Sequence, residues 1–520
     1  MTQSRTHYIP VSGITIEKIK EAVTESMPTL DGVSINPAVY CPANGYIVPP
    51  DPAVLCPSVG YYDPSLPLPY IPPGEIPATD PPSEDDGITL ICSNQYDGAI
   101  NFRVTTSSGQ YKTDIYDLGN TLIDSVLTNS NVTRFYAFDP STGTTGTDGN
   151  KYYKVIITPA TAGQELRTFA VQTLTGYAAY SWPIVEAHFK SPGLTSLADA
   201  FLNQRGLRIV KFHADVNNLT SLYRVCSTCS NLESFEMDVS ANSLSTIQLG
   251  FSSTPKLENI KLPSALPALG TAQGAFNTSG IKNNPFPASL PEVTNMSTAM
   301  FNCKNLKGTV TLPAMPKVTN LANVIGACDN ITKVVLETNS TGLTILTMAE
   351  NCVSLNEIVI RGTWHDASSI IRFVKSCHSL KKLVFDVIFT GTNPTIWDPF
   401  DLAGNYTVED FTPPTFNGTG IVSLRLQLNK LTSFVCASLK ASGPYLYATS
   451  SRPSNIELID VDWTTVNNNT TLRYGNLPTA EINRIFGLLP AASATIDVRN
   501  NPGYTTCDKT IATAKGWTVL

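Results

Sequence analysis

Four cysteines recur at an even spacing in the middle of the chain, and they are the first residues that could carry chemistry. Cys303, Cys328, Cys352 and Cys377 follow one another at steps of 25, 24 and 25, and each is followed three residues later by Leu or Ile. Thiols at a fixed period could bind a metal, exchange electrons, form disulfides or pack as small apolar groups. The spacing alone leaves all four uses open.

The pair Cys226 and Cys229 has the Cys-x-x-Cys spacing of zinc and redox motifs. A zinc site of this kind needs a second pair, and the sequence contains none. Cys229 falls in register with the four repeating cysteines, and Cys226 then matches the apolar Met300 and Ile325. We therefore interpret both cysteines as core residues.

The other residues capable of catalysis show no working arrangement. The five histidines have no spacing with Cys, Asp or Glu that builds a metal site, and the neighbours His365 and Asp366 are not a typical dyad. The sequence holds no nucleophile elbow, phosphate loop, dinucleotide fingerprint or His-Glu-x-x-His helix. We expect no enzymatic activity, no cofactor and no catalytic or metal site. A glycosidase stays open, because separated carboxylates cannot be paired from sequence.

The cysteines belong to a longer repeat, whose period of about 25 residues is typical of repeat arrays. A Leu or Ile followed by a short alternating apolar run predicts one strand per repeat. Ahead of the cysteine, apolar residues stand at positions 0, 3, 4 and 7, as in Met296, Ala299, Met300 and Cys303, which predicts a helical stripe. The repeated positions are Leu207, Leu232, Leu257, Ile281, Leu306, Ile331, Leu355 and Leu380.

The predicted helices limit which cysteines could form disulfides. Packed helices lie about 8–10 Å apart, too far for most disulfides between neighbouring repeats. The start of the chain, MTQSRTHYIPVSG, lacks the basic and apolar regions of a secretory signal, so we expect a reducing cytoplasm at synthesis. The four repeating cysteines are therefore expected to be buried, unpaired and slow to react with thiol reagents.

The segments CVSLNEIVI and CDNITKVVL, with CSNLESFEM and CHSLKKLVF, resemble the cysteine-containing BspA-like class of leucine-rich repeats. The repeats at Leu257 and Ile281 lack the cysteine, and CKNLKGTVTL has one extra residue before its strand. The resemblance implies an α/β leucine-rich repeat solenoid over residues 191–390. Residues 391–520 are then expected to hold irregular repeats and a C-terminal cap, because terminal repeats must cover an open core.

Two different regions precede the repeats, so the expected fold is multidomain. Residues 1–86 contain a short amphipathic helical pattern and 14 prolines between residues 37 and 82, which favours an anchor arm or a spacer. Residues 87–190 alternate strand-like runs with Gly- and Thr-rich turns, which predicts an all-β sandwich. The candidate anchor residues in the arm are Ile16, Ile19, Val23, Tyr46, Tyr61 and Tyr62.

Residues between the apolar positions of each repeat strand should line one open face of the solenoid. Their charges are mixed and the net charge is −7, which argues against nucleic acid and allows a protein or glycan partner, or a merely solvated face. No apolar run is long enough for a membrane span. The candidate face comprises Arg208, Lys211, Glu233, Glu236, Glu258, Lys261, Thr332, Lys333, Asn356, Glu357, Lys381 and Lys382.

An anchor arm, a β region and a distal repeat array together are similar to the layout of bacteriophage tail fibres and other virion appendages. We therefore expect a non-enzymatic virion structural protein, homo-oligomeric, made in the host cytoplasm. Residues 1–86 would contact other virion proteins, and the repeats would bind host-surface glycan or protein or neighbouring subunits. The alternatives are a bacterial surface adhesin and, from another class, a polysaccharide-degrading tailspike.

Overall fold

The computed structural model describes residues 87–94, 99–172, 183–367, 369–371, 374–391, 407–417, 425–426, 430–441, 443–446, 448, 450 and 453–520, and the backbone of two short strands nearer the N-terminus. These two are β1 (Tyr40–Cys41) and β2 (Tyr46–Ile47), which pair antiparallel. They belong to one compact unit, and residues 73–174 and 180–520 belong to another. Tyr46 lies in β2, and the other candidate anchor residues lie outside the described residues.

Residues 87–190 form two antiparallel sheets, so the prediction of an all-β region here is confirmed. One sheet has the order β10-β4-β7, and the other contains β11-β3-β9-β5-β6 with β8 beside β9. Phe169 packs against Phe102 and Phe189, with ring centroids 6.0 and 6.3 Å apart. The strands are β3 (Gly87–Ser93), β4 (Ala99–Thr106), β5 (Gln110–Asp117), β6 (Leu122–Asn129), β7 (Thr133–Ala137), β8 (Thr144–Thr145), β9 (Lys151–Pro159), β10 (Leu166–Val171) and β11 (Ile184–Lys190).

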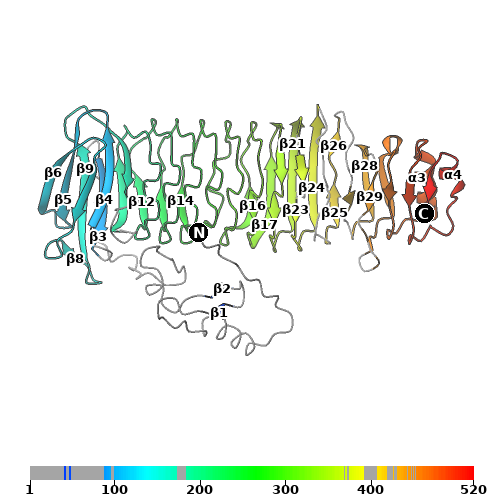
Figure 1. The fold of residues 1–520 in the computed structure, drawn as a ribbon, viewed down its shortest axis with the longest axis horizontal. Helices are drawn as coiled ribbons and strands as arrows, with labels where there is room; N and C mark the ends of the chain where they lie inside the picture. The colour runs from blue at the N-terminus through cyan, green and yellow to red at the C-terminus, as the bar shows by residue number, and fades with distance from the viewer. Residues whose placement is uncertain are drawn as a thin grey trace, which may run out of the picture. The chain divides into compact units, whose positions relative to one another are not determined.

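Both sheets continue into the repeat array (Figure 1). Strand β11 pairs in parallel with β12 (Ile209–Phe212), which pairs with β13 (Ser234–Glu236) and then β14 (Asn259–Lys261). On the other side, Thr168 of β10 forms a parallel bridge with Ser196 of the first coil. The predicted domain boundary between residues 190 and 191 remains a prediction, because the hydrogen-bonded sheets run across it.

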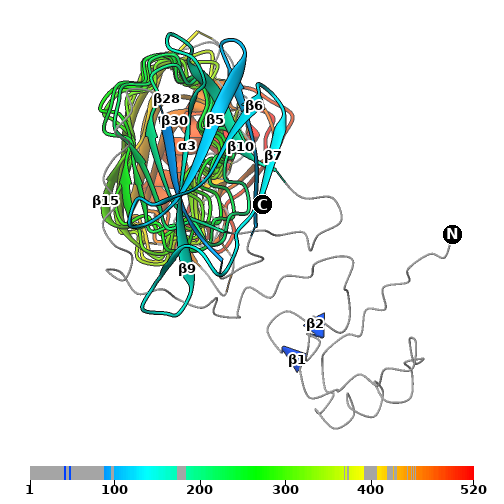
Figure 2. The same ribbon diagram turned by 90° about the vertical axis from the view of Figure 1, so that its left-hand side faces the viewer.

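The repeats form a β-solenoid of about 12 turns. Viewed along the stack, successive coils superimpose (Figure 2). A separate parallel sheet follows, with β15 (Lys307–Thr311), β17 (Asn330–Glu337), β21 (Glu357–His365), β24 (Lys382–Thr390) and β25 (Asp410–Thr412). The coil between the two sheets, residues 281–290, forms no strand. Shorter strands complete the walls: β16 (Ile325–Gly326), β18 (Ser340–Thr341), β19 (Thr344–Leu346), β20 (Ala349–Glu350), β22 (Ser369–Ile371) and β23 (Val374–Lys375).

The last coils are less regular and carry the few helices. The expected order of helix, strand, helix and final strand is confirmed by α3 (Thr479–Leu488), β32 (Thr495–Asp497), α4 (Thr510–Thr513) and β33 (Thr518–Val519). The remaining elements are β26 (Thr415–Phe416), β27 (Arg425–Leu426), β28 (Ser433–Lys440), β29 (Tyr445–Leu446), β30 (Leu458–Asp462), the 3-10 helix η1 (Trp463–Thr465) and β31 (Thr470–Thr471).

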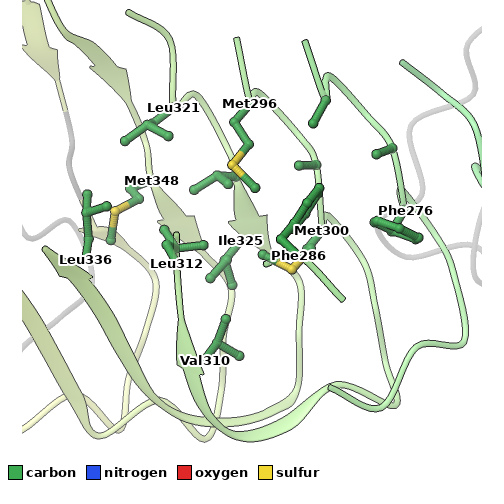
Figure 3. Packing of buried hydrophobic residues seen from close by; sticks show 14 of the residues in the cluster. Phe276, Phe286, Met296, Met300, Val310, Leu312, Leu321, Ile325, Leu336 and Met348 are labelled. Atoms are coloured by element: carbon green, nitrogen blue, oxygen red, sulfur yellow. The ribbon is translucent and has the colours of Figure 1, made fainter. Parts of the chain in front are cut away.

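One apolar core runs through the coils. Figure 3 shows Met296, Met300, Leu321, Ile325 and Met348 among the side chains that pack between consecutive coils. All five are 0% exposed. Burying a side chain of this size stabilises the fold by roughly 1.5–3 kcal/mol, so each coil depends on its neighbours to cover its apolar residues.

The prediction of a helix in each repeat was wrong, although its inward-facing residues were identified correctly. The N–H groups of Met296, Thr298 and Met300 donate to carbonyl oxygens of the next coil, with N···O distances of 2.8–3.0 Å. Between them, the N–H of Ala299 donates to the carbonyl of Met296, and that of Phe301 to Thr298, each at 3.2 Å. Every second N–H therefore forms a bond between coils, where a helix would use it for a bond four residues back.

Two left-handed residues per segment produce this path. Thr298 and Asn302 have φ values of 53° and 57°, and the equivalent Asn323 and Ala327 have 50° and 53°. Each left-handed residue lies in a tight turn. Two such turns, four residues apart, direct the apolar positions 0, 3, 4 and 7 of the stripe toward the core. The apolar spacing is thus the same as in a helix, but the backbone is a stack of turns.

The left-handed turns predict opposite effects for one substitution at two sites in the same coil. Ala327 has a positive φ, and left-handed backbone costs a residue with a Cβ about 1–2 kcal/mol, whereas Ala322 is not among the positive-φ residues. We expect Ala327→Gly to raise the free energy of unfolding by about 0.5–1 kcal/mol and Ala322→Gly to lower it by a similar amount. Urea unfolding of both variants measures this, and a loss of stability in both would contradict the turn geometry.

Candidate binding faces

The candidate face predicted from sequence lies along two parallel sheets, β12 to β14 and β15 to β25, whose outer side we call the strand face. Its residues stack in columns, because coil after coil places the same position in line. Lys211, Glu236 and Lys261 are paired in register across β12, β13 and β14. Glu236 Oε2 lies 3.7 Å from Lys211 Nζ and 3.8 Å from Lys261 Nζ. The charges along this column therefore alternate.

A second column runs beside the first and holds half of the predicted face residues. Arg208 donates two hydrogen bonds to Glu233, at 3.2 and 3.0 Å, and Arg208 itself is buried. Glu258, next in the column, pairs with Lys282 of the following coil at 2.5 Å. Farther along, the Asn356 N–H donates to the Thr332 carbonyl and the Lys381 N–H donates to the Asn356 carbonyl. These three residues therefore also stack in line.

The strands nearer the C-terminus repeat this alternation. Lys333 Nζ lies 3.0 Å from Glu357 Oε2, and Lys382 Nζ lies 3.2 Å from Asp410 Oδ2. Arg361 lies between Glu337 and Asp386 of the neighbouring coils, at 2.9 and 3.8 Å. The twelve predicted residues thus lie in or directly before the strands β12, β13, β14, β17, β21 and β24.

These ion pairs explain the mixed charge of the strand face without a partner. Side chains of Lys333 and Glu357 are 35% and 27% exposed, and such surface pairs contribute only about 0.2–1 kcal/mol each. Opposite charges in adjacent coils favour the correct register, and like charges there would oppose it. Binding of a partner by this face remains a prediction.

A second face, which the sequence analysis missed, is formed by the segments that contain the left-handed turns. We call it the turn face. Four consecutive coils contribute residues 245–253, 270–278, 294–302 and 319–327, and none of these segments contains a charged residue. Gln248 Nε2 donates to Gln273 Oε1 of the next coil at 3.3 Å. The outward residues of these four coils are mostly hydroxyls and amides, so this part of the turn face is uncharged and polar. In the coils before and after it, Arg224 pairs with Asp199 and Lys375 with Glu350.

The turn face has a sequence signal in the residue just before each apolar stripe. Ser221, Thr246 and Asn295 occupy this position, and each side-chain oxygen accepts a hydrogen bond from the N–H two residues later. Such side-chain turns are typical of Ser, Thr and Asn. Their recurrence at the repeat period could have predicted turns in place of a helix.

A histidine pair joins the N-terminal sheet to the first coil. His188 Nδ1 lies 3.1 Å from His213 Nε2, and His188 Nε2 lies 3.2 Å from Glu186 Oε2. Burial lowers the pKa of His213, and the nearby His188 and Lys211 lower it further. The two histidines are one repeat period apart in the sequence, so stacking places them side by side. A search for the short spacings of metal ligands along the chain does not find such a pair.

The repeating cysteines are core residues. Cys303, Cys328, Cys352 and Cys377 are all 0% exposed and none forms a disulfide, as predicted. The thiols of Cys303 and Cys328 lie 3.0 and 3.1 Å from the carbonyl oxygens of Phe276 and Met300 in the preceding coil, to which they donate. A hydrogen bond with Cys303 and burial raise the pKa of Cys328.

The distance between neighbouring coils does not prevent disulfides, contrary to the prediction from helix spacing. Neighbouring coils are joined by a β-ladder, whose strands lie about 4.7–4.9 Å apart, not by helices about 8–10 Å apart. Cysteines one coil apart therefore have backbones close enough for a disulfide. Cys226 and Cys229 are likewise buried and free. Across the described part of the chain, no three His, Cys, Asp or Glu side chains form a metal-binding group.

Comparison with known proteins identifies the repeat. A family model described as the BspA type leucine rich repeat region matches in six copies, at residues 171–272, 220–347 and 248–381. The coils between residues 171 and 381 thus match BspA-type leucine-rich repeats. The BspA-type repeats thus cover the strand face and the turn face, and they support a repeat-based binding or adhesin role. No curated protein and no solved structure matches the chain. Within the described residues, no helix has the length and apolar character needed to cross a membrane.

Burial predicts which thiols react in the native protein. We expect Cys303, Cys328, Cys352 and Cys377 to react with an alkylating reagent only as the BspA-type repeats unfold, because each is 0% exposed. Cys507, which is only partly buried, is the internal comparison and should react before these four. Peptide mass spectrometry over a time course measures the labelling. Equal rates at Cys507 and Cys352 in the folded protein would contradict the packing.

Proposed function

We propose that this chain is a non-enzymatic attachment protein of a bacteriophage virion, acting as a tail fibre or a head or collar appendage. Residues 1–86 dock on the particle, and the BspA-type repeats bind either the host surface or a neighbouring virion subunit. The repeat match supports the binding part of this proposal. The virion part is supported by the layout of a proline-rich segment, an all-β region and a long repeat array.

The stack of coils in the described residues is the observation that carries this proposal. Its stability comes from the shared core and the hydrogen bonds between coils. The outward residues of each column are therefore free to vary without loss of the fold, and they repeat along a surface several coils long. A surface of this kind suits contact with an extended or repeated partner.

Within this proposal, the strand face makes the contact. It carries exposed charged side chains, and its ion pairs contribute little to stability, so their groups can be redirected to a partner at small cost. Lys333 with Glu357, and Lys382 with Asp410, are the clearest examples, because all four side chains are at least 27% exposed.

A bacterial surface adhesin is the second candidate, and the BspA-type repeats themselves favour it. The two candidates share the binding face and differ in what residues 1–86 attach to. A virion protein would use them to join the particle, whereas an adhesin would be carried on a cell surface. The partner of residues 1–86 therefore distinguishes the two.

The binding face is tested with matched double variants. Lys333→Ala with Glu357→Ala removes one ion pair of the strand face and leaves the net charge unchanged. Gln248→Ala with Gln273→Ala is the control on the turn face. We expect the first variant to weaken binding to host cells by about tenfold, equivalent to about 1.4 kcal/mol, and the second to have little effect. A loss confined to the turn-face variant would contradict the assignment.

The attachment is tested by mass spectrometry of purified particles that carry the full chain or a chain lacking residues 1–86. We expect the full chain in the particles and the truncated chain in the unassembled fraction. Circular dichroism of the truncated chain checks that the remaining residues are folded. Recovery of the folded, truncated chain in particles would refute the anchor, and absence of the full chain from particles would refute the virion role.

A further inference from the structure

Among the described residues, the sheet that begins the solenoid ends in an edge strand, in which the Ser125 N–H donates to Asp124 Oδ1 at 2.9 Å. In the order β14-β13-β12-β11-β3-β9-β5-β6, strand β6 is the last, and no described strand pairs with its outer edge. An edge strand presents unpaired N–H and C=O groups, and proteins commonly guard such edges with Lys, Pro or a bulge. The eight residues of β6, LIDSVLTN, contain no Lys, Arg or Pro. Their single irregularity, opposite Ile115 and Tyr116, leaves residues 124–129 in regular pairing with β5.

Exposed apolar side chains gather at the same end. Ten large apolar side chains are exposed in the described residues, and four of them lie between residues 122 and 135. Leu127 and Leu122, at 57% and 53%, are the most exposed of the ten. Val132 and Phe135, next to and within the edge strand β7, are 48% and 39% exposed. Figure 2 views the molecule from this end, with β5, β6 and β7 toward the reader. A solenoid end is expected to be polar, so this composition indicates a contact surface.

We propose that β6 pairs antiparallel with β6 of a second copy of this chain, about a twofold axis that passes midway between the two Val126 residues. Residues 124, 126 and 128 face the core side, because they pair with Ile115, Thr113 and Tyr111, which are buried. Side chains opposite each other in a sheet must share a face, so the two copies can pair Val126 with Val126 and Asp124 with Thr128. This register also sets Leu127 beside Ser125 of the second copy.

Charge supports a second copy as the occupant. Asp124 is the only charged residue of β6, and Arg134 of β7 already pairs with it at 3.4 Å. In the register centred on Val126, each Asp124 faces a hydroxyl and not the other Asp124, so self-pairing brings no like charges together. The twofold pairing also closes the assembly, because each β6 edge is used once and no further copy can be added there.

The consequence is a bivalent particle. In each copy the coils follow β11 and therefore lie on the side of the sheet away from β6. Pairing through β6 joins two sheets edge to edge and leaves both strand faces and both turn faces uncovered. Two repeat arrays on one dimer would increase apparent affinity for a repeated ligand without any new contact in either array. The dimer itself does not depend on what the repeats bind.

The interface is tested by light scattering of the full chain after size-exclusion chromatography. We expect a mass twice the 56.1 kDa of one chain. Leu127→Lys places a charge at the edge and should weaken the dimer at least tenfold, giving the mass of one chain on dilution. Val353→Lys is the matched control, since Val353 is 50% exposed on a distant coil, and it should remain dimeric. Thermal unfolding checks that both variants are folded. A monomeric native chain, or a Leu127→Lys variant that keeps its dimer mass, would overturn the proposal.

The register is tested with Val126→Cys. Residues opposite each other in antiparallel strands have Cα atoms about 4.5–5.5 Å apart, within disulfide range. A diazene-dicarboxamide oxidant would accept the two protons and two electrons released as the two introduced thiols join, and become the hydrazine. We expect a covalent dimer on a non-reducing gel that a thiol reductant reverses. The native chain, treated in parallel, controls for its own cysteines. A dimeric sample of Val126→Cys that does not cross-link would overturn the register centred on Val126.

Discussion

The hydrogen bonds between coils are the interaction on which the rest of the structure depends. Every second N–H of a segment such as 296–302 donates to a carbonyl of the next coil, which fixes the stacking of the coils at the spacing of a β-ladder. The left-handed residues, such as Thr298 and Asn302, turn the chain so that this is possible. Because a single coil cannot satisfy these groups or cover its apolar residues, the array is stable only as a stack.

The same stacking determines what lies on each surface. Residues one repeat apart in sequence become direct neighbours, so a column can be a row of alternating charges, of hydroxyls and amides, or of thiols. Lys211, Glu236 and Lys261 illustrate the first kind, and Cys303 with Cys328 the last. His188 and His213 meet for the same reason. The repeat period therefore determines which residues of neighbouring coils are in contact.

The two ends of the described solenoid are finished differently. At the C-terminal end the coils become irregular and α3 and α4 are added to them. At the other end both sheets of the N-terminal β region continue the walls of the first coil, and this region finishes in the edge strands β6 and β7. The N-terminal β region therefore covers the core of the coils but leaves its own sheet edge available.

The sequence by itself determined the repeat, its period and which residues face the core. Met296, Ala299, Met300 and Cys303 were assigned inward from their spacing, and all are 0% exposed. The strands of most repeats and the order of elements at the C-terminus were also predictable, because they depend on local apolar patterns. The repeat at Ile281 is an exception, since it forms no strand. The family of the repeat followed from the same residues.

Only the tertiary structure decided the backbone between the strands and the pairing of the surface charges. Positions 0, 3, 4 and 7 face one way both in a helix and in two successive four-residue turns, so the spacing could not distinguish them. The choice depends on where the N–H groups find acceptors, and the acceptors belong to the next coil, a full repeat away in sequence. A local pattern carries no information on that bond, whereas stacking decides it.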